Sequence, residues 1–429
     1  MNNRKIYPNN ISISILFIIT ILSPYIVWPF SFVAGYISAI ILLFILYAPF
    51  LFSNSYKIFI NSKLIFIFSF ILFYPPLISF IIYTNIDIQI IKLILSIALM
   101  IIIGVGLAFR WSRIGIETSL IILLCTWYFY LILAHSVLII LEFYYPSLRA
   151  AIESVMAVDR TVDYLYGVRF RGVASAGGAN LAFAHGLGGV IGFYLYSKKM
   201  LALPVLVISS ATILMGMVFV GRTGFLVFLL GAIFVCIFLQ QRKNIKRSGF
   251  LSMVIGISII FSGIYAAPDV YESLPRHYQK YSIDLFLNGV EGLEKDGTLN
   301  TLISMYDFPD DFFSLMLGVG NYSGGFVKGY SWPSDPGIMK VFTAYGIPFG
   351  LFLYLLLLLS CLRNPSREYR SLFILICFLM FFVEVKEPLI LKGYASRFLW
   401  ILMGVAIYSK GIIKIVKWES FGQPKINKR

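Results

Sequence analysis

Apolar runs recur from one end of this 429-residue chain to the other, separated by short polar connections. A run of about twenty apolar residues is what a helix needs to cross the hydrocarbon core of a bilayer. Hydrophobic residues make up 59% of the chain and charged residues 13%, whereas about a quarter of the residues of a soluble domain are charged. The sequence therefore predicts an all-α integral membrane protein, with residues 1–429 forming a single polytopic domain.

The apolar runs predict about twelve transmembrane helices. We place them at residues 11–29, 32–52, 64–84, 88–108, 116–138, 178–196, 201–220, 223–239, 250–267, 337–360, 371–389 and 396–414. Two long polar segments, 145–177 and 268–335, connect spans on the same side of the membrane. Apolar residues recur at helical spacing over 271–285, which predicts a helix on the membrane surface. A second short helix is expected near 298–306.

The basic residues between the runs predict the orientation. More than half of the 35 Lys and Arg residues lie in alternate connections that hold few acidic residues, and cytoplasmic loops retain positive charge. We therefore expect both termini and the 240–248 loop in the cytoplasm, and 145–177 and 268–335 outside. The net charge of +15 then reflects topology and contact with anionic membrane lipids, and it does not require a nucleic acid partner.

Cysteine and histidine are sparse. All four cysteines lie in or at the ends of apolar runs, so we interpret them as small buried hydrophobes and expect no disulfide framework. The chain has three histidines, none of them spaced from another His or Cys as metal ligands are. We predict no metal site, and we interpret His135 as a histidine satisfied within the helix bundle.

Two arginine motifs stand out against the apolar background. Arg169 and Arg171 lead into a glycine-rich turn at the start of the 178–196 run, where the helix N-terminus and the planar guanidinium groups both suit an anion. Arg222 lies between two apolar runs and is flanked by Gly221 and Gly224. An arginine at the bilayer centre costs about 2.5–3.5 kcal/mol, so it should be paired or face a cavity. The alternatives are a solvated loop for the first motif and an interfacial anchor for the second.

The long outer loop carries the other candidate groups. Arg276 and His277 fall on the polar side of the expected surface helix. Tyr330 and Trp332 can stack on sugar rings, or they belong to the aromatic belt at the membrane interface. Asp335 comes directly before the 337–360 run, where it either orients a substrate hydroxyl or caps the helix.

Charged residues also crowd the segment that follows the 371–389 run. Glu384, Lys386 and Glu387 come first, and Lys392 and Arg397 follow before the last helix. Such a group either neutralises itself by ion pairing or lines the cavity that the arginines face. The sequence leaves both interpretations open.

Together these features resemble the Wzy-type polysaccharide repeat-unit polymerases, which comprise the O-antigen and capsule polymerases and are related to the O-antigen ligases. The resemblance covers nearly the whole chain in layout. It rests on the span number, the late outer loop and a series of short motifs: Arg169-Phe-Arg-Gly172, Gly221-Arg-Thr-Gly224, Gly318-Val-Gly320, Ser334-Asp-Pro-Gly337, Tyr345-Gly-Ile-Pro-Phe-Gly350, Val385-Lys-Glu-Pro388 and Ser396-Arg-Phe-Leu-Trp400.

The resemblance implies a metal-independent glycosyltransferase of GT-C-like architecture on the outer face of the bacterial inner membrane, without a cofactor. Its donor would be a glycan on undecaprenyl pyrophosphate, and its acceptor the terminal sugar hydroxyl of an incoming lipid-linked unit. It implies a flippase and a chain-length regulator of the same pathway as partners. It assigns catalytic roles to Arg171, Arg222 and Asp335 and substrate binding to Arg169, Arg276, His277, Tyr330, Trp332, Lys386 and Arg397.

The chain departs from its relatives in two places. The ligases commonly carry a histidine just before the span that follows the long loop, where this chain has Ser334-Asp335. Some polymerases carry a glycine eleven residues after an arginine, and this spacing is also absent here. The residue eleven positions after Arg160 is Arg171, and the one after Arg169 is Asn180. A ligase that transfers finished glycan to a lipid core therefore stays an alternative, as does a lipid-oligosaccharide flippase or transporter. Transporters tend to show internal repeats, and no repeat relates residues 1–200 to 201–414.

Overall fold

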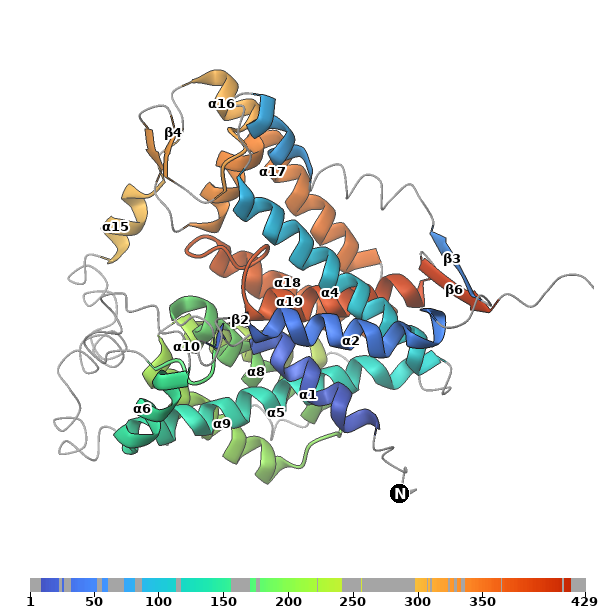
Figure 1. Cartoon of the computed structure of the whole chain (residues 1–429). Coiled ribbons are helices and arrows are strands. Elements are labelled where there is room, and N and C mark those ends of the chain that lie inside the picture. Colours follow the sequence, from blue (N-terminus) through green and yellow to red (C-terminus); the bar gives the residue numbers. More distant parts are fainter. Residues whose placement is uncertain are drawn as a thin grey trace, which may run out of the picture.

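Helices form most of the structure, with a few short strands between them (Figure 1). The computed structural model describes residues 9–22, 25–26, 32–51, 56–60, 73–81, 87–112, 117–155, 170–174, 178–221, 223–240, 256, 298–306, 308, 311–322, 325–327, 330–332, 336–363, 365–410 and 413–417. Every structural statement below concerns these residues.

Most of the described helices overlap the predicted runs. The helices are α1 Asn9–Leu22, α2 Ala34–Leu51, an unlabelled helix at 73–81, α4 Ile88–Ser112, α5 Glu117–Tyr144, α6 Pro146–Val155, α8 Gly178–Ser197, α9 Leu203–Val220, α10 Thr223–Gln240, α15 Thr298–Ser304, α16 Phe312–Leu317, α17 Gly337–Arg363, α18 Arg370–Glu384 and α19 Tyr394–Ser409. The predicted span 11–29 is too long, because α1 ends at Leu22 and Tyr25–Ile26 form a strand, and of the predicted span 64–84 only 73–81 is described. Helix α5 extends to Tyr144, beyond the predicted end at residue 138. The predicted span 250–267 lies outside the described residues apart from Gly256, as does the predicted surface helix at 271–285.

Three antiparallel pairs of short strands accompany the helices. β1 (Tyr25–Ile26) pairs with β2 (Phe32–Val33), and β3 (Tyr56–Ile60) pairs with β6 (Ile413–Lys417). In the long loop, β4 (Gly325–Val327) pairs with β5 (Tyr330–Trp332). The short helix expected near 298–306 is present as α15, whereas the β4–β5 hairpin was not predicted.

Four helices are long and apolar enough to cross a membrane: Ile88–Ser112, Leu120–Tyr144, Leu203–Val220 and Gly337–Arg363. On α4, Ile88, Leu95 and Ile102 lie seven residues apart on one face and are 65%, 60% and 46% exposed. A helix that turns such side chains outward suits contact with lipid. The chain is thus a mostly helical protein of membrane-spanning character, with fewer helices of spanning length among the described residues than the twelve predicted.

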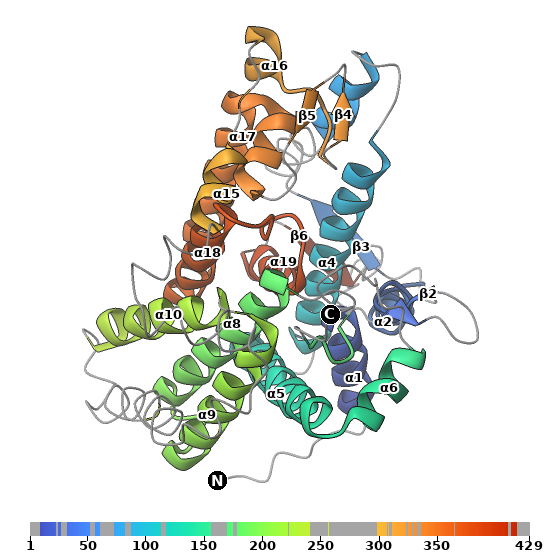
Figure 2. The same cartoon turned by 90° about the vertical axis from the view of Figure 1, so that its left-hand side faces the viewer.

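Helix α8 lies at the centre of the lower part of the molecule (Figure 2). Every residue from Leu181 to Leu195 is buried, and α8 packs against α5, α9, α10, α18 and α19. A helix that is apolar on all sides is stable only when other elements surround it. Its glycines allow close packing, since the positions of Gly188 and Gly192 face Ile132 and Phe129 of α5.

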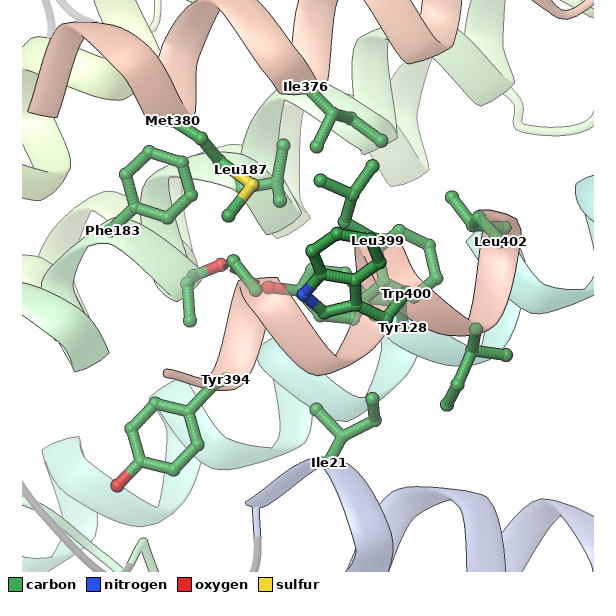
Figure 3. Close-up of a cluster of buried hydrophobic side chains, with 14 of the residues drawn as sticks. Ile21, Tyr128, Phe183, Leu187, Ile376, Met380, Tyr394, Leu399, Trp400 and Leu402 are labelled. Atoms are coloured by element: carbon green, nitrogen blue, oxygen red, sulfur yellow. Dashed lines mark hydrogen bonds between the residues drawn. The ribbon is translucent and has the colours of Figure 1, made fainter. Parts of the chain in front are cut away.

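Large side chains from several helices fill the core beside α8 (Figure 3). Phe183 and Leu187 of α8 face Ile376 and Met380 of α18. Trp400 of α19 is buried among them, and its indole N–H donates to the Ile390 carbonyl at 3.1 Å. This core therefore connects α18, α19 and the loop between them to the central helix.

Helix α17 is broken at Gly346, which has a φ of 73° and a ψ of 162°. Pro348 has no N–H, so the carbonyl of Ala344 lacks its usual helical donor. The N–H of Gly320 donates to this carbonyl at 3.1 Å, and the N–H of Val319 donates to the Thr343 carbonyl at 2.7 Å. The Gly318-Val-Gly320 motif of the long loop is thus docked on the break in α17.

Helix 73–81 completes this upper part of the molecule. The Tyr74 hydroxyl donates to the Leu317 carbonyl at 3.0 Å, and its ring stacks on Phe349 with the centroids 4.3 Å apart. Figures 1 and 2 both show α16 at the outer end of α17, beside this helix. The end of the long loop is therefore part of the packed structure.

Candidate functional site

Arg171 lies in a buried turn just before α8. Arg171 is only 6% exposed to solvent. The N–H of Ala174 donates to the Arg171 carbonyl at 3.0 Å, and Gly172 has a φ of 55°, in the left-handed region that favours glycine. A turn at Gly172 is present as predicted and α8 begins at Gly178, while residues 175–177 of the predicted glycine-rich turn lie outside the described residues.

Aromatic packing fastens this turn to two helices. The ring of Phe170 packs edge-on against Phe143 of α5 and Phe219 of α9, at centroid distances of 6.0 and 5.8 Å. The N–H of Phe170 also donates to the Phe219 carbonyl at 3.0 Å. The backbone beside Arg171 is therefore joined to the last turn of α9, immediately before the Gly221-Arg222 junction.

A buried carboxylate holds the same turn from α5. Glu142 is 4% exposed, and its Oε2 accepts a hydrogen bond from the Gly172 N–H at 3.3 Å. The guanidinium groups of Arg149 and Arg171 interact with it electrostatically. Carboxylates in apolar helices are rare and mark functional positions when they are paired in this way.

Two histidines make a hydrogen-bonded chain beneath the turn. His135 Nδ1 lies 2.9 Å from His185 Nε2, and His185 Nδ1 lies 3.0 Å from the Ser136 hydroxyl. All three side chains are buried. His135 and Glu142 are seven residues apart on α5 and therefore share a face of that helix. Sequence reasoning missed His185, although a histidine in a glycine-rich apolar run was the available signal.

The junction that carries Arg222 packs against the same half of α8. Arg222 lies outside the described residues, but α9 ends at Val220 and α10 begins at Thr223, as predicted. A Cβ added at Gly224 would lie 2.6 Å from the Ala182 carbonyl of α8, and Gly186 of α8 faces the Gly224 carbonyl. The segments of both arginine motifs therefore meet at the N-terminal half of α8.

A second buried carboxylate, Glu384, lies at the end of α18. It is fully buried, and its Oε2 accepts hydrogen bonds from the N–H groups of Leu389 and Ile390 at 2.7 and 2.8 Å. The Tyr354 hydroxyl donates to Oε1 at 3.3 Å. These neutral donors satisfy the carboxylate, so part of the expected charged cluster has a local structural role.

Tyrosines of the long loop lie around Glu384. The Tyr306 hydroxyl donates to the Val385 carbonyl, and the N–H of Tyr322 donates to Asp87 at 2.8 Å. Burial first, and the Glu384 carboxyl second, raise the pKa of the Tyr322 hydroxyl above its ordinary value. These two tyrosines of the loop therefore lie near the buried end of α18.

Pro336 and Gly337 bring the start of α17 against Glu384. A Cβ added at Gly337 would lie 2.5 Å from Glu384 Oε1. The first helical hydrogen bond runs from the Lys340 N–H to the Pro336 carbonyl at 3.1 Å. Pro336 thus occupies the cap position that the sequence suggested for Asp335, and Asp335, outside the described residues, falls one residue earlier.

The segment after α18 connects the two carboxylate regions. Leu389 and Ile390 bind Glu384, and Gly393 follows with a φ of 130°. The position of Gly393 faces the Asn180 side chain in the first turn of α8. A continuous set of contacts therefore runs from the start of α17 past Glu384 to the N-terminal end of α8, where the Arg171 turn also lies.

The remaining predicted site residues differ in what the structure describes. Arg397 is partly buried and donates from Nη1 to the Ile21 carbonyl at 2.9 Å, so it caps the C-terminal end of α1. Lys386 lies two residues after the end of α18 and is partly buried. Tyr330 and Trp332 are described by their backbone in β5. Three further predicted residues lie outside the described ranges: Arg169, Arg276 and His277.

Within the described ranges, no three His, Cys, Asp or Glu side chains converge in a way that could hold a metal ion. A comparison with protein-family models, with curated protein sequences and with solved structures finds no match. The chemistry of the site must therefore be argued from its own residues: a buried arginine, a buried carboxylate and two linked imidazoles at the start of the central helix.

Proposed function

We propose that this protein is a membrane-embedded glycosyltransferase that polymerises lipid-linked oligosaccharide repeat units. The growing glycan moves from undecaprenyl pyrophosphate to the terminal sugar hydroxyl of an incoming lipid-linked unit. The observation that carries the proposal is the buried Arg171 turn, which is bonded to the end of α9 directly before Arg222. The turn of the first arginine motif is thus joined to the residues that directly precede the second motif.

Arginine suits the leaving group of this reaction. Negative charge gathers on the pyrophosphate as the bond to the anomeric carbon breaks, and guanidinium groups bind phosphate oxygens bidentately. A buried guanidinium attracts a phosphate more strongly than an exposed one, because its surroundings screen its charge less. Arg171 and Arg222 together would stabilise the leaving pyrophosphate as preorganised positive charges. The N-terminal end of α8 adds a favourable helix dipole.

The acceptor hydroxyl needs a group that takes its proton. As the bond from the anomeric carbon to the pyrophosphate oxygen breaks, the acceptor oxygen bonds to that carbon and its proton passes to a carboxylate. Undecaprenyl pyrophosphate leaves with the electrons of the broken bond. We assign the carboxylate to Asp335, and Glu142, which holds the Arg171 turn, is the second candidate.

The other predicted residues would bind the substrates on the outer face of a bacterial inner membrane. Tyr330 and Trp332 would stack on sugar rings. Charged and polar contacts to the phosphates and the glycan would come from Arg169, Arg276, His277 and Lys386. Both termini would be cytoplasmic, and a flippase and a chain-length regulator of the same pathway would be the protein partners.

The glycan ladder of a strain lacking this protein tests the proposal. A polymerase deletion leaves surface glycan with a single repeat unit. A ladder that persists only on the carrier lipid would instead identify a ligase. The complete absence of glycan on the outer side, with repeat units retained inside, would identify a flippase. Only the first outcome supports the proposal, and complementation by the intact chain is the control.

A further inference from the structure

The two buried histidines form a chain with a defined direction. The Ser136 hydroxyl donates its one proton to the Ile132 carbonyl at 2.9 Å. Its oxygen must then accept from His185 Nδ1–H, at 3.0 Å. A neutral His185 accepts at Nε2 from His135 Nδ1–H, at 2.9 Å. One backbone carbonyl thus sets the direction of the hydrogen bonds along the chain and leaves His135 Nε2 as its free end.

The Nε2 atom of His135 faces the Arg171 turn. His135 Nε2 is buried and has no hydrogen bond of good geometry within the described part of the chain, but the ring interacts with the Arg171 backbone. It lies against the backbone of Arg171 and Gly172, and a Cβ added at Gly172 would be 2.6 Å from Nε2. The turn therefore packs directly against the edge of the imidazole.

The turn is held from a second point on the same helix face. Glu142 accepts the Gly172 N–H at 3.3 Å and lies two helical turns beyond His135 on α5. The ring of His135 can fix the position of the turn relative to α5 only if the ring itself cannot rotate. Its hydrogen bond to His185, which is itself held by Ser136, prevents that rotation, because breaking these bonds would leave buried polar groups unsatisfied.

We infer that the His135–His185–Ser136 chain is a positioning element that sets the place of the Arg171–Gly172 turn and, through it, of the Arg171 guanidinium. The histidines act through Arg171 and do not touch the reacting atoms. The inference about the turn stands on geometry alone. Its consequence for pyrophosphate binding rests on the proposed function.

Hydrogen exchange at the turn tests the positioning directly. Three N–H groups report on it, because Phe170, Gly172 and Ala174 donate to Phe219, Glu142 and Arg171 respectively. In the purified full chain, His185→Leu and Ser136→Ala should speed exchange over 170–174 by about tenfold or more by allowing local opening. His185→Gln should stay within about twofold of the parent, because glutamine both donates and accepts.

Ser210→Ala is the matched control, since Ser210 is also a buried serine and its hydroxyl has no hydrogen-bond partner among the described residues. It should leave exchange at the turn unchanged. If His185→Leu and Ser136→Ala both exchange like the parent over 170–174, the inference is wrong. If His185→Leu fails to fold, Ser136→Ala alone still decides the question.

Binding of farnesyl pyrophosphate separates the two proposals. Arg171→Ala should weaken binding by about tenfold or more through loss of a charge-assisted contact. His185→Leu should weaken it several-fold, and His185→Gln should bind like the parent. Unchanged binding by Arg171→Ala would refute the anion site and leave the exchange result standing. Weakening by Arg171→Ala but not by His185→Leu would refute the inference. Equal losses in His185→Gln and His185→Leu would also overturn it, because the ring would then carry charge or a proton.

Discussion

Arg171 is the residue whose surroundings are best suited to the proposed chemistry. It is nearly excluded from solvent, and it lies beside Glu142 in a turn that α5 and α9 hold. A guanidinium in such a place is costly unless it has partners or a ligand. Its position at the start of α8, rather than its charge alone, distinguishes it from the many surface arginines.

Replacing the arginines should abolish polymer formation. We expect Arg171→Ala and Arg222→Ala each to reduce glycan transfer by about 100-fold or more, as the loss of a preorganised charge does elsewhere. Arg171→Lys should not restore full activity, because an ammonium cannot form the bidentate fork. Quantified glycan ladders at equal protein level measure this. Arg367→Ala, an exposed arginine in the turn before α18, is the control. A fully active Arg222→Ala would identify Arg222 as an interfacial anchor.

Glu384 should matter for stability. Glu384→Ala leaves the N–H groups of Leu389 and Ile390 without their acceptor in a buried site. Each unsatisfied group costs about 1–3 kcal/mol, so we expect the free energy of unfolding to fall by about 3 kcal/mol. Glu384→Gln keeps one carbonyl oxygen and should lose less. Thermal unfolding in detergent measures both, and an unchanged midpoint for Glu384→Ala would contradict the hydrogen-bonding account.

At the scale of elements, the break in α17 is the clearest case of motifs that fit one another. Gly346 and Pro348 free two helix carbonyls, and the Gly318-Val-Gly320 segment donates to them. The two motifs were recognisable in the sequence as separate features. Their pairing was not, because a proline in an apolar run indicates a kink without indicating which distant backbone will satisfy the freed groups.

Gly346→Ala should release the end of the long loop. Alanine at a φ of 73° costs about 1–2 kcal/mol, and its Cβ would collide with the Met316 carbonyl. We expect proteolysis between residues 298 and 335 to become about tenfold faster, since loss of docking exposes the backbone. Gly256→Ala is the control, because no atom lies within 4 Å of the added Cβ. Equal cleavage of both variants would show that the docking contributes little.

At the scale of the whole molecule, the apolar runs predicted the helices well because burial in lipid demands long apolar segments. They predicted the site less well. His185 and Glu142 lie within apolar runs, and their partnership with Arg171 depends on how α5 and α8 pack. A helix cap was the structural alternative to a catalytic role for Asp335, but the first helical bond places Pro336 at the cap. The sequence indicates which polar residues lie within or between apolar runs, and the packing of the helices determines which of them come into contact.

Orientation is a prediction of the charge distribution. Ser323→Cys lies in the long loop, which we expect outside because basic residues concentrate in the alternate connections. It should react with a membrane-impermeant maleimide in intact cells whose outer membrane has been made permeable. The parent chain is the control, since three of its four cysteines are buried and the fourth is partly buried. Labelling that requires opening of the inner membrane would reverse the predicted topology.

The central claim is glycan transfer between two carrier lipids, and it is tested most directly with the purified chain in lipid nanodiscs. The chain is supplied with the undecaprenyl-pyrophosphate-linked repeat unit of its own cell, without added metal or other protein. We predict lipid-linked products of two or more repeats, with one undecaprenyl pyrophosphate released per bond formed, and no such products from Arg171→Ala. If the active preparation leaves the repeat unit unchanged, or if Arg171→Ala elongates it at the rate of the parent, the account is contradicted.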